Sequence, residues 1–311
     1  MKISALVRIL IWAVIACVLI GIFVAALAVP NMLSRFSINM PFSCAGAGSV
    51  YYDDAERYTP GGGSVAASGI REIELNWVEG RVNIVEGTGD SIRFSETGAG
   101  ALEEKYQLHS YVKGDKLIIQ FCKANTRTFQ VLNKTLTLEL PQGMELTELT
   151  VQSVSAKVEI GKASAEKLSI TTVSGAMEAT GIKAGTIKAE AVSGNIMLSQ
   201  SSGREFSANS ISGSILLENS QFEEVNADGV SGEIALSPGN VLKRLKAESV
   251  SGNLRVTLPE NMPFTASYDS VSGNFQCDFP VEMQKERAIY LGGGADIDLE
   301  TISGGIYIHK E

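Results

Sequence analysis

Seven serines recur at nearly equal spacing, and a serine hydroxyl can act as a nucleophile when a base lies beside it. Each is preceded by valine or isoleucine and followed by glycine. Starting from Ser155 of the degenerate copy Val154-Ser155-Ala156, the intervals are 19, 19, 19, 19, 20, 21 and 31 residues. A nucleophile is normally unique, so we expect a structural role for all the pairs: Ser174-Gly175, Ser193-Gly194, Ser212-Gly213, Ser231-Gly232, Ser251-Gly252, Ser272-Gly273 and Ser303-Gly304.

Carboxylates form the second group of residues that could take part in chemistry. Glu190, Asp228 and Glu248 occupy the same position in their copies of the repeat, and Lys188 and Lys246 stand two residues before the first and last of them. Neighbouring acids could serve as general acid and base in glycan hydrolysis, or bridge a calcium ion. A solvated strand face also alternates in charge. We expect this ordinary face, without a catalytic residue, metal site or cofactor.

Histidine and cysteine offer little further chemistry. Two histidines, His109 and His309, are too few for a three-histidine metal site. The cysteines lack the CxxC spacing of zinc sites and do not suggest a disulfide framework. With Cys17 in an apolar segment, a pair among the other three stays open. The four are Cys17, Cys44, Cys122 and Cys277.

The repeat itself predicts β-strands. Apolar residues stand three and five places after each serine, as in Ile196 and Leu198, and a second alternating segment precedes the serine, as in Phe206 and Ala208. Alternation is typical of strands, and a period near twenty residues is typical of solenoids. We therefore predict an all-β fold: a parallel, β-helix-like β-solenoid of two-strand coils of roughly 19–21 residues, stacked about 4.8 Å apart.

The valine, serine and glycine between the two strands predict a corner of each coil. We expect the glycine to supply a positive φ there, because it has no Cβ to clash. The serine hydroxyls should then form a ladder along the stack.

The residue four places after each serine should point outward between two buried positions. Three adjacent members, Met197, Leu216 and Ala235, are apolar and predict a contact stripe. In the alternative, the Pro280–Gly294 excursion folds back and covers the stripe with Met283 or Ile289. The full column is Glu178, Met197, Leu216, Ala235, Arg255, Gln276 and Tyr307.

The N-terminal region predicts a membrane anchor. An apolar stretch of 21 residues, Ile9–Val29, follows Lys2 and Arg8. Its length suits one transmembrane helix, and the preceding positive charge orients the rest of the chain outward. Because Ala26-Leu27-Ala28 has the form of a cleavage site, a signal peptide is the alternative. We therefore predict an anchor, or uncleaved signal, over residues 1–30.

Two further regions follow. Prolines and a run of three glycines make residues 31–69 a predicted flexible linker. Residues 70–311 are the predicted solenoid domain, with irregular coils that cap its N-terminal end to about 148 and regular repeats over 149–311. Thr137–Pro141 before Met144 resembles Arg255–Pro259 before Met262, so the same coil-to-coil passage should be used twice. Residues 296–309 should close the chain as its final coil.

Charge excludes one class of partner. The chain has 26 Lys and Arg against 35 Asp and Glu, for a formal net charge of −9. An acidic body without a basic stripe should be repelled by nucleic acid.

These features together resemble a known family. Val-Ser-Gly-Asn corners, strands ending in Leu-Pro and one N-terminal apolar segment are similar to the "putative adhesin" family of bacterial β-strand-repeat proteins of unknown function. The resemblance covers about Ile70 to Glu311. Members of that family include membrane-anchored proteins of Lia-type envelope-stress operons, which implies an extracytoplasmic solenoid in envelope defence or surface contact. The family motif is the corner, so no functional site is carried over.

We therefore expect a non-enzymatic, single-pass protein of the bacterial cytoplasmic membrane with its C-terminal domain outside. Its surface would bind an envelope component or another copy of the chain. The alternative is a glycan-active β-helix enzyme that uses the acidic outer face.

Overall fold

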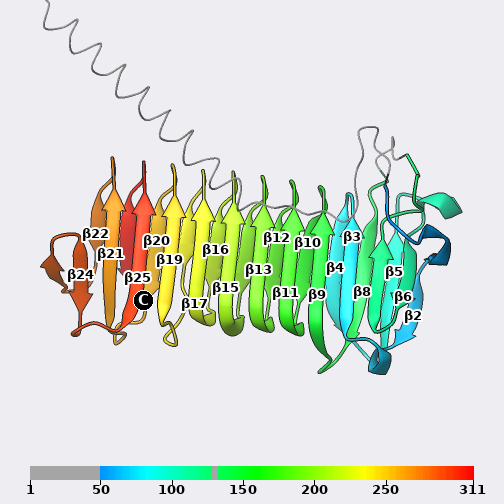
Figure 1. Cartoon of the computed structure of the whole chain (residues 1–311), viewed down its shortest axis with the longest axis horizontal. Helices are drawn as coiled ribbons and strands as arrows, with labels where there is room; N and C mark the ends of the chain where they lie inside the picture. Colours follow the sequence, from blue (N-terminus) through cyan, green and yellow to red (C-terminus); the bar gives the residue numbers. More distant parts are fainter. Residues whose placement is uncertain (1–49, 128–131) are drawn as a thin grey trace, which may run out of the picture. The chain divides into compact units, whose positions relative to one another are not determined.

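The computed structural model describes residues 50–127 and 132–311 (Figure 1). The chain divides into two units, Met1–Asn39 and Met40–Glu311, and all described residues belong to the second. Within these residues no helix is both long and apolar enough to cross a membrane. The predicted anchor, Ile9–Val29, lies outside the described residues and stays a prediction.

Two sheets build the described part of the domain. The first, the long-strand sheet, has 14 strands in the spatial order β1 (Thr59–Pro60), β6 (His109–Lys113), β7 (Lys116–Gln120), β3 (Glu72–Trp77), β9 (Glu145–Ser153), β11 (Ser164–Thr172), β13 (Lys183–Ala191), β15 (Ser202–Ser210), β17 (Gln221–Gly229), β19 (Arg244–Ser249), β25 (Ala295–Thr301), β21 (Phe264–Ser270), β24 (Arg287–Tyr290) and β23 (Glu282–Gln284).

The second, the short-strand sheet, has 12 strands in the order β2 (Gly63–Ala66), β5 (Ser91–Thr97), β8 (Thr135–Pro141), β4 (Arg81–Gly87), β10 (Lys157–Gly161), β12 (Met177–Thr180), β14 (Ile196–Ser199), β16 (Ile215–Glu218), β18 (Ile234–Leu236), β20 (Leu254–Leu258), β26 (Ile306–Lys310) and β22 (Phe275–Cys277). Three short 3-10 helices complete the described elements: η1 (Ala55–Arg57), η2 (Ala67–Gly69) and η3 (Glu104–Tyr106).

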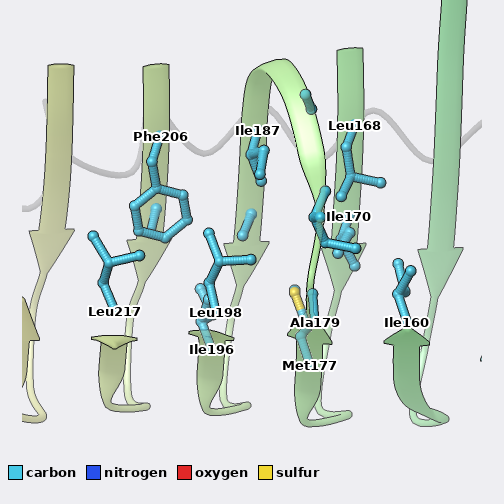
Figure 2. Close-up of a cluster of buried hydrophobic side chains, with 14 of the residues drawn as sticks. Ile160, Leu168, Ile170, Met177, Ala179, Ile187, Ile196, Leu198, Phe206 and Leu217 are labelled. Atoms are coloured by element: carbon cyan, nitrogen blue, oxygen red, sulfur yellow. The ribbon is translucent and has the colours of Figure 1, made fainter. Parts of the chain in front are cut away.

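Each regular coil contributes one strand to each sheet, and successive coils pair in parallel. Because alternate residues of a strand face opposite sides, the apolar half of each strand points between the sheets. Phe206 and Leu217, one from each sheet, are fully buried there. Figure 2 shows these side chains meeting in one continuous interior. The predicted all-β parallel solenoid with two strands per coil is confirmed.

The order of coils in space differs from their order in the sequence. The coil formed by β25 and β26 is the last coil of the chain, as predicted, but it does not lie at the end of the stack. It lies between the β19–β20 coil and the β21–β22 coil. At the other end, the β3–β4 coil lies between β7–β8 and β9–β10. The passages from β8 to β9 and from β20 to β21 therefore each step over one coil. These are the two passages that share the Leu-Pro pattern.

Antiparallel strands close both ends. At the N-terminal end β5 pairs with β8 and β6 with β7, and these carry β2 and β1 outside them. Residues 50–69, predicted as part of a flexible linker, thus contribute two strands and two 3-10 helices to this cap. At the C-terminal end β24 pairs with β21, and β23 pairs with β24. Solenoid ends need such covers because they otherwise expose unpaired backbone.

Candidate contact surface

The recurring serines have backbone partners. The hydroxyls of Ser193, Ser212 and Ser231 donate to the carbonyl oxygens of Val173, Val192 and Ile211, at 3.4, 3.4 and 3.3 Å. In each case the acceptor precedes the equivalent serine of the neighbouring coil. The serines form a column as predicted, but their hydroxyls bond to backbone rather than to one another. Such a partner does not activate a hydroxyl, whereas a nucleophile needs a base.

The corner glycines are required for a different reason from the predicted one. Among the seven, only Gly232 has a positive φ, of 129°. A Cβ built on Gly213 would instead lie 2.1 Å from the carbonyl oxygen of Gly194, and one on Gly194 would lie 2.0 Å from that of Gly175. The expectation of positive φ therefore holds at Gly232 and is wrong at the other six corner glycines. Glycine is needed because successive coils bring their backbones into direct contact here.

Left-handed backbone occurs at the opposite corner of the coils, directly before the long strands. Lys162, Gly181, Gln200 and Asn219 occupy equivalent positions there, with φ of 48°, 70°, 49° and 46°. Only one of the four is glycine. The sequence analysis missed this corner because its residue types vary, although their spacing follows the repeat.

The predicted stripe forms one register column of the short-strand sheet. Met197 pairs with Leu216, and Leu216 pairs with Ala235. Met197 is 39% exposed, and the other two are half-buried. The Pro280–Gly294 excursion does not cover them, because its strands β23 and β24 belong to the other sheet. Met283, one of the two proposed covers, is itself exposed.

Charged groups border the stripe along the column. On one side Glu178 lies 2.8 Å from Lys157. On the other, Arg255 forms an ion pair with Glu233, and its guanidinium lies 5.8 Å from the ring centre of Tyr307. Because of the inserted coil, Tyr307 rather than Gln276 follows Arg255 in the column.

Uncharged polar groups flank the stripe along the strands. The side-chain oxygen of Asn195 accepts a hydrogen bond from the Ser214 N–H at 3.0 Å, and the hydroxyls of Thr180 and Ser199 are 3.0 Å apart. The stripe is therefore a narrow apolar line, three coils long, within a polar sheet face.

The acidic column of the long-strand sheet continues past Glu248. Asp228 is followed in register by Glu248, Glu300 and Asp269, because the inserted coil brings Glu300 between the other two. Burial and the nearby carboxylate of Asp298 raise the pKa of Glu300. Other acids of the face have lysine partners: Lys246 pairs with Glu248, and Lys188 lies 2.8 Å from Glu190. Over residues 50–127 and 132–311, no group of three or more His, Cys, Asp or Glu is placed to hold a metal ion.

A buried charge that the sequence analysis did not identify lies in the N-terminal cap. The ammonium group of Lys134, fully buried, is 2.6 Å from the Glu96 carboxylate and donates to the carbonyl oxygens of Tyr106 and Phe121. It also lies 4.9 Å from the ring centre of Trp77. Burial lowers the pKa of Lys134, although the Glu96 carboxylate opposes that effect. Its sequence neighbours carry no pattern that would have revealed this role.

Comparison with known proteins gives the family. The model of the Toastrack DUF4097 family matches residues 70–309. The chain belongs to this family. No curated protein matches it.

Crystal structures of bacterial proteins are similar to this Toastrack chain. One, described as a "putative lipid binding protein" from Parabacteroides distasonis, is 17% identical with a TM-score of 0.51, over 81% of this chain and 97% of its own. A "putative adhesin" from the same species is 15% identical with a TM-score of 0.44, over 81% and 97%. A "putative cell adhesion protein" from Clostridium sporogenes is 15% identical with a TM-score of 0.27, over 81% and 100%. At these identities the likeness concerns the fold alone.

Proposed function

We propose that this Toastrack protein is a non-enzymatic, adhesin-like protein of the bacterial envelope that binds through the outer face of its short-strand sheet. The observation that supports this function most directly is the stripe of Met197, Leu216 and Ala235, which places apolar side chains on a polar face. Contiguous exposed apolar surface often marks a contact site. The partner is an envelope component or a second copy of the chain.

The proposed location is outside the cytoplasmic membrane, with residues 1–30 as a retained single-pass anchor and a role in the response to envelope stress. Support comes from the apolar length of Ile9–Val29 and the positive residues before it. Protease added to intact spheroplasts should then digest the solenoid. A chain that is soluble and begins at Val29 would contradict the anchor.

Replacing Met197 and Leu216 together with serine tests the contact surface. We expect binding to isolated cell envelopes, or self-association measured by sedimentation, to fall at least tenfold while the melting temperature changes little. Val241→Ser is the matched control, because Val241 is exposed but lies outside the stripe. If the double variant binds and associates as the parent does, the stripe has no role.

The acidic column supports a second candidate, a glycan-active enzyme. Glu300 lies beside Glu248, and the pKa of Glu300 is raised. A carboxyl group with a raised pKa beside a second carboxylate is the arrangement of the general acid in glycoside hydrolases. Release of reducing sugar from envelope polysaccharide, lost in Glu300→Gln and kept in the stripe variant, would favour this enzyme over the adhesin-like protein.

A further inference from the structure

The outer side of the N-terminal cap, near β6 in Figure 1, holds a small cavity lined by aromatic and acidic side chains. Its floor is the outer face of β3, β7 and β6, where Glu74, Ile118 and Tyr111 lie in one register row. The residues on either side of η1 form its wall and contribute Tyr52 and Tyr58. The cavity has a volume of about 150 Å³. A cavity of that size holds a ligand about as large as benzene, so it suits one small chemical group.

Three tyrosine rings form a continuous aromatic lining. The ring centres of Tyr52 and Tyr58 are 4.7 Å apart, those of Tyr58 and Tyr111 are 5.4 Å apart, and the rings are tilted by 55° and 53°. Hydrogen bonds hold the outer two rings in place: the Tyr52 hydroxyl donates to the Cys122 carbonyl at 3.0 Å, and the Tyr111 hydroxyl accepts from Arg57 at 3.1 Å. Because the face of an aromatic ring is electronegative, such a lining attracts a cation.

Carboxylates outnumber ammonium groups around the cavity. Asp53, Asp54 and Glu74 line it together with one lysine, Lys113. Lys113 Nζ lies 3.2 Å from the Asp54 carboxylate, and the lysine side chain is 61% exposed, so it neutralises the rim from the solvent side. Glu74 also lies 3.6 Å from Lys116 Nζ. The remaining excess of negative charge, beside electronegative ring faces, favours a cationic ligand over an anion or a neutral sugar.

The backbone at Asp54 turns its carboxylate toward this rim. Asp54 has a φ of 54°, in the left-handed region that residues other than glycine seldom adopt. It stands directly before η1, but its side chain makes no capping hydrogen bond there. The carboxylate faces Lys113 instead. Backbone conformations of this kind are frequent at binding sites.

An unpaired acceptor adds a requirement for N–H donors. Gln120 lines the cavity and is 3% exposed. Its side-chain oxygen is buried and has no hydrogen-bond partner among the described residues. Buried polar atoms normally have such a partner. A primary ammonium group brings three N–H donors, whereas a quaternary ammonium ion brings none.

We propose that this cavity, the tyrosine pocket, binds a primary ammonium group, which is the protonated amine of a small molecule or of a lipid head group. The rings of Tyr58 and Tyr111 contact the cation, and the Asp54 carboxylate attracts it. Gln120 accepts one of its N–H donors. Lys113 competes with the ligand for Asp54 and so limits the affinity. The tyrosine pocket belongs to the long-strand sheet, so this activity is separate from contact through the apolar stripe of the other sheet.

Ligand titration followed by NMR tests the chemistry of the ligand. The full-length chain in non-ionic detergent is titrated with ethylammonium chloride and with tetramethylammonium chloride at neutral pH and constant ionic strength. We expect the Kd for ethylammonium to be at least fivefold lower, because only ethylammonium carries N–H donors. Equal Kd values, or no binding of ethylammonium, would overturn the proposal.

A third probe separates the two sources of the amine. Glycerophosphoethanolamine carries the same primary ammonium group beside a phosphate. Binding tighter than that of ethylammonium would assign the pocket to a lipid head group. Weaker binding would assign it to an amine without a phosphate, because the carboxylates at the rim repel phosphate.

Variants of the lining test the site itself. Asp54→Asn and Tyr58→Leu should each raise the Kd for ethylammonium at least fivefold, and asparagine also tolerates the left-handed backbone at position 54. Lys113→Gln should lower the Kd at least threefold, because it removes the competing ammonium group. Glu56→Gln and Tyr51→Leu are the matched controls, because both residues are exposed, lie close in sequence and do not line the cavity.

The melting temperature of each variant is measured alongside the Kd. Unchanged affinity in both Asp54→Asn and Tyr58→Leu, or weaker binding in Lys113→Gln, would overturn the proposal. The double serine variant of Met197 and Leu216 should bind ethylammonium as the parent does. The tyrosine pocket and the stripe can therefore fail separately.

Discussion

At the scale of single residues, each Ser-Gly corner makes two hydrogen bonds and one close contact between backbones. The serine donates its hydroxyl to the neighbouring coil, and the glycine allows the two backbones to touch. A third residue, two places before the serine, completes the corner: the Ser210 hydroxyl accepts from the Gly213 N–H at 2.9 Å, and Ser249 and Thr172 do the same for Gly252 and Gly175. These hydroxyls are buried, so their bonds are shielded from water.

Gly213→Ala is therefore expected to destabilise the protein although its φ is ordinary. The added Cβ would lie 2.1 Å from the Gly194 carbonyl oxygen, so the coils must separate locally. We expect a loss of about 1–3 kcal/mol in the free energy of unfolding, measured by urea denaturation. Gly100→Ala is the control, because nothing lies within 4 Å of its added Cβ. Equal stability of the two variants would show that the corner tolerates a side chain.

Removing one partner of the Lys134–Glu96 pair should destabilise the protein strongly, whereas replacing both partners with apolar residues should destabilise it little. Glu96→Ala leaves a buried ammonium ion without its carboxylate and should cost about 3–5 kcal/mol. Replacing both partners, as Lys134→Met with Glu96→Leu, should recover most of that loss because no buried charge remains. Thermal unfolding of the two variants and the parent tests this, and an equal loss in both would contradict it.

The same pair predicts a dependence on pH. Because burial lowers the pKa of Lys134, the unfolded chain binds more protons than the folded chain between the folded pKa and the ordinary value near 10.4. Stability from this group should therefore rise with pH across that window. Lys134→Met should reduce the rise, measured as the difference in unfolding free energy between parent and variant at successive alkaline pH values.

At the scale of elements, the sequence predicted which residues form strands better than it predicted which strands pair with each other. Period and alternation identify two strands per coil because each coil repeats the same inward positions, such as Ile187 and Phe206. They do not fix the order of coils, since a coil pairs equally well with any neighbour of the same shape. The two Leu-Pro passages mark the places where the order of coils changes. The residues near each passage do not indicate which coil is inserted between the two coils that the passage connects. The outer stripe followed from the alternation, whereas Lys134 did not, because its pocket is assembled from distant segments.

Removing residues 295–311 should therefore open the stack rather than shorten it. The deletion takes β25 and β26 from between two coils and leaves β19 and β21 without the strand that joins them. We expect trypsin to cut residues 259–294 at least tenfold faster than in the parent. A solenoid whose last coil were terminal would lose only its end, and unchanged cleavage would support that simpler arrangement.

At the scale of the whole molecule, the outer faces of the two sheets carry different groups of residues. The long-strand sheet carries the acidic column and its lysine partners, and the short-strand sheet carries the apolar stripe with an ion pair at each end. Their shared interior is one hydrophobic core that runs through all the coils. Because each coil rests mainly on its two neighbours, a substitution on one outer face should leave the other face unchanged.

The inserted coils also impose an order on folding during synthesis. In a solenoid whose coils follow the sequence, each new coil can settle on the one before it as the chain emerges. Here the slot between β20 and β22 stays empty until the last residues, Ile306–Lys310, have been made. The contacts that close it join segments about fifty residues apart, so they form late. A chain that ends before these residues leaves the strands on both sides of the missing coil with unpaired edges. Quality-control proteases can recognise these exposed edges before the protein reaches its partner.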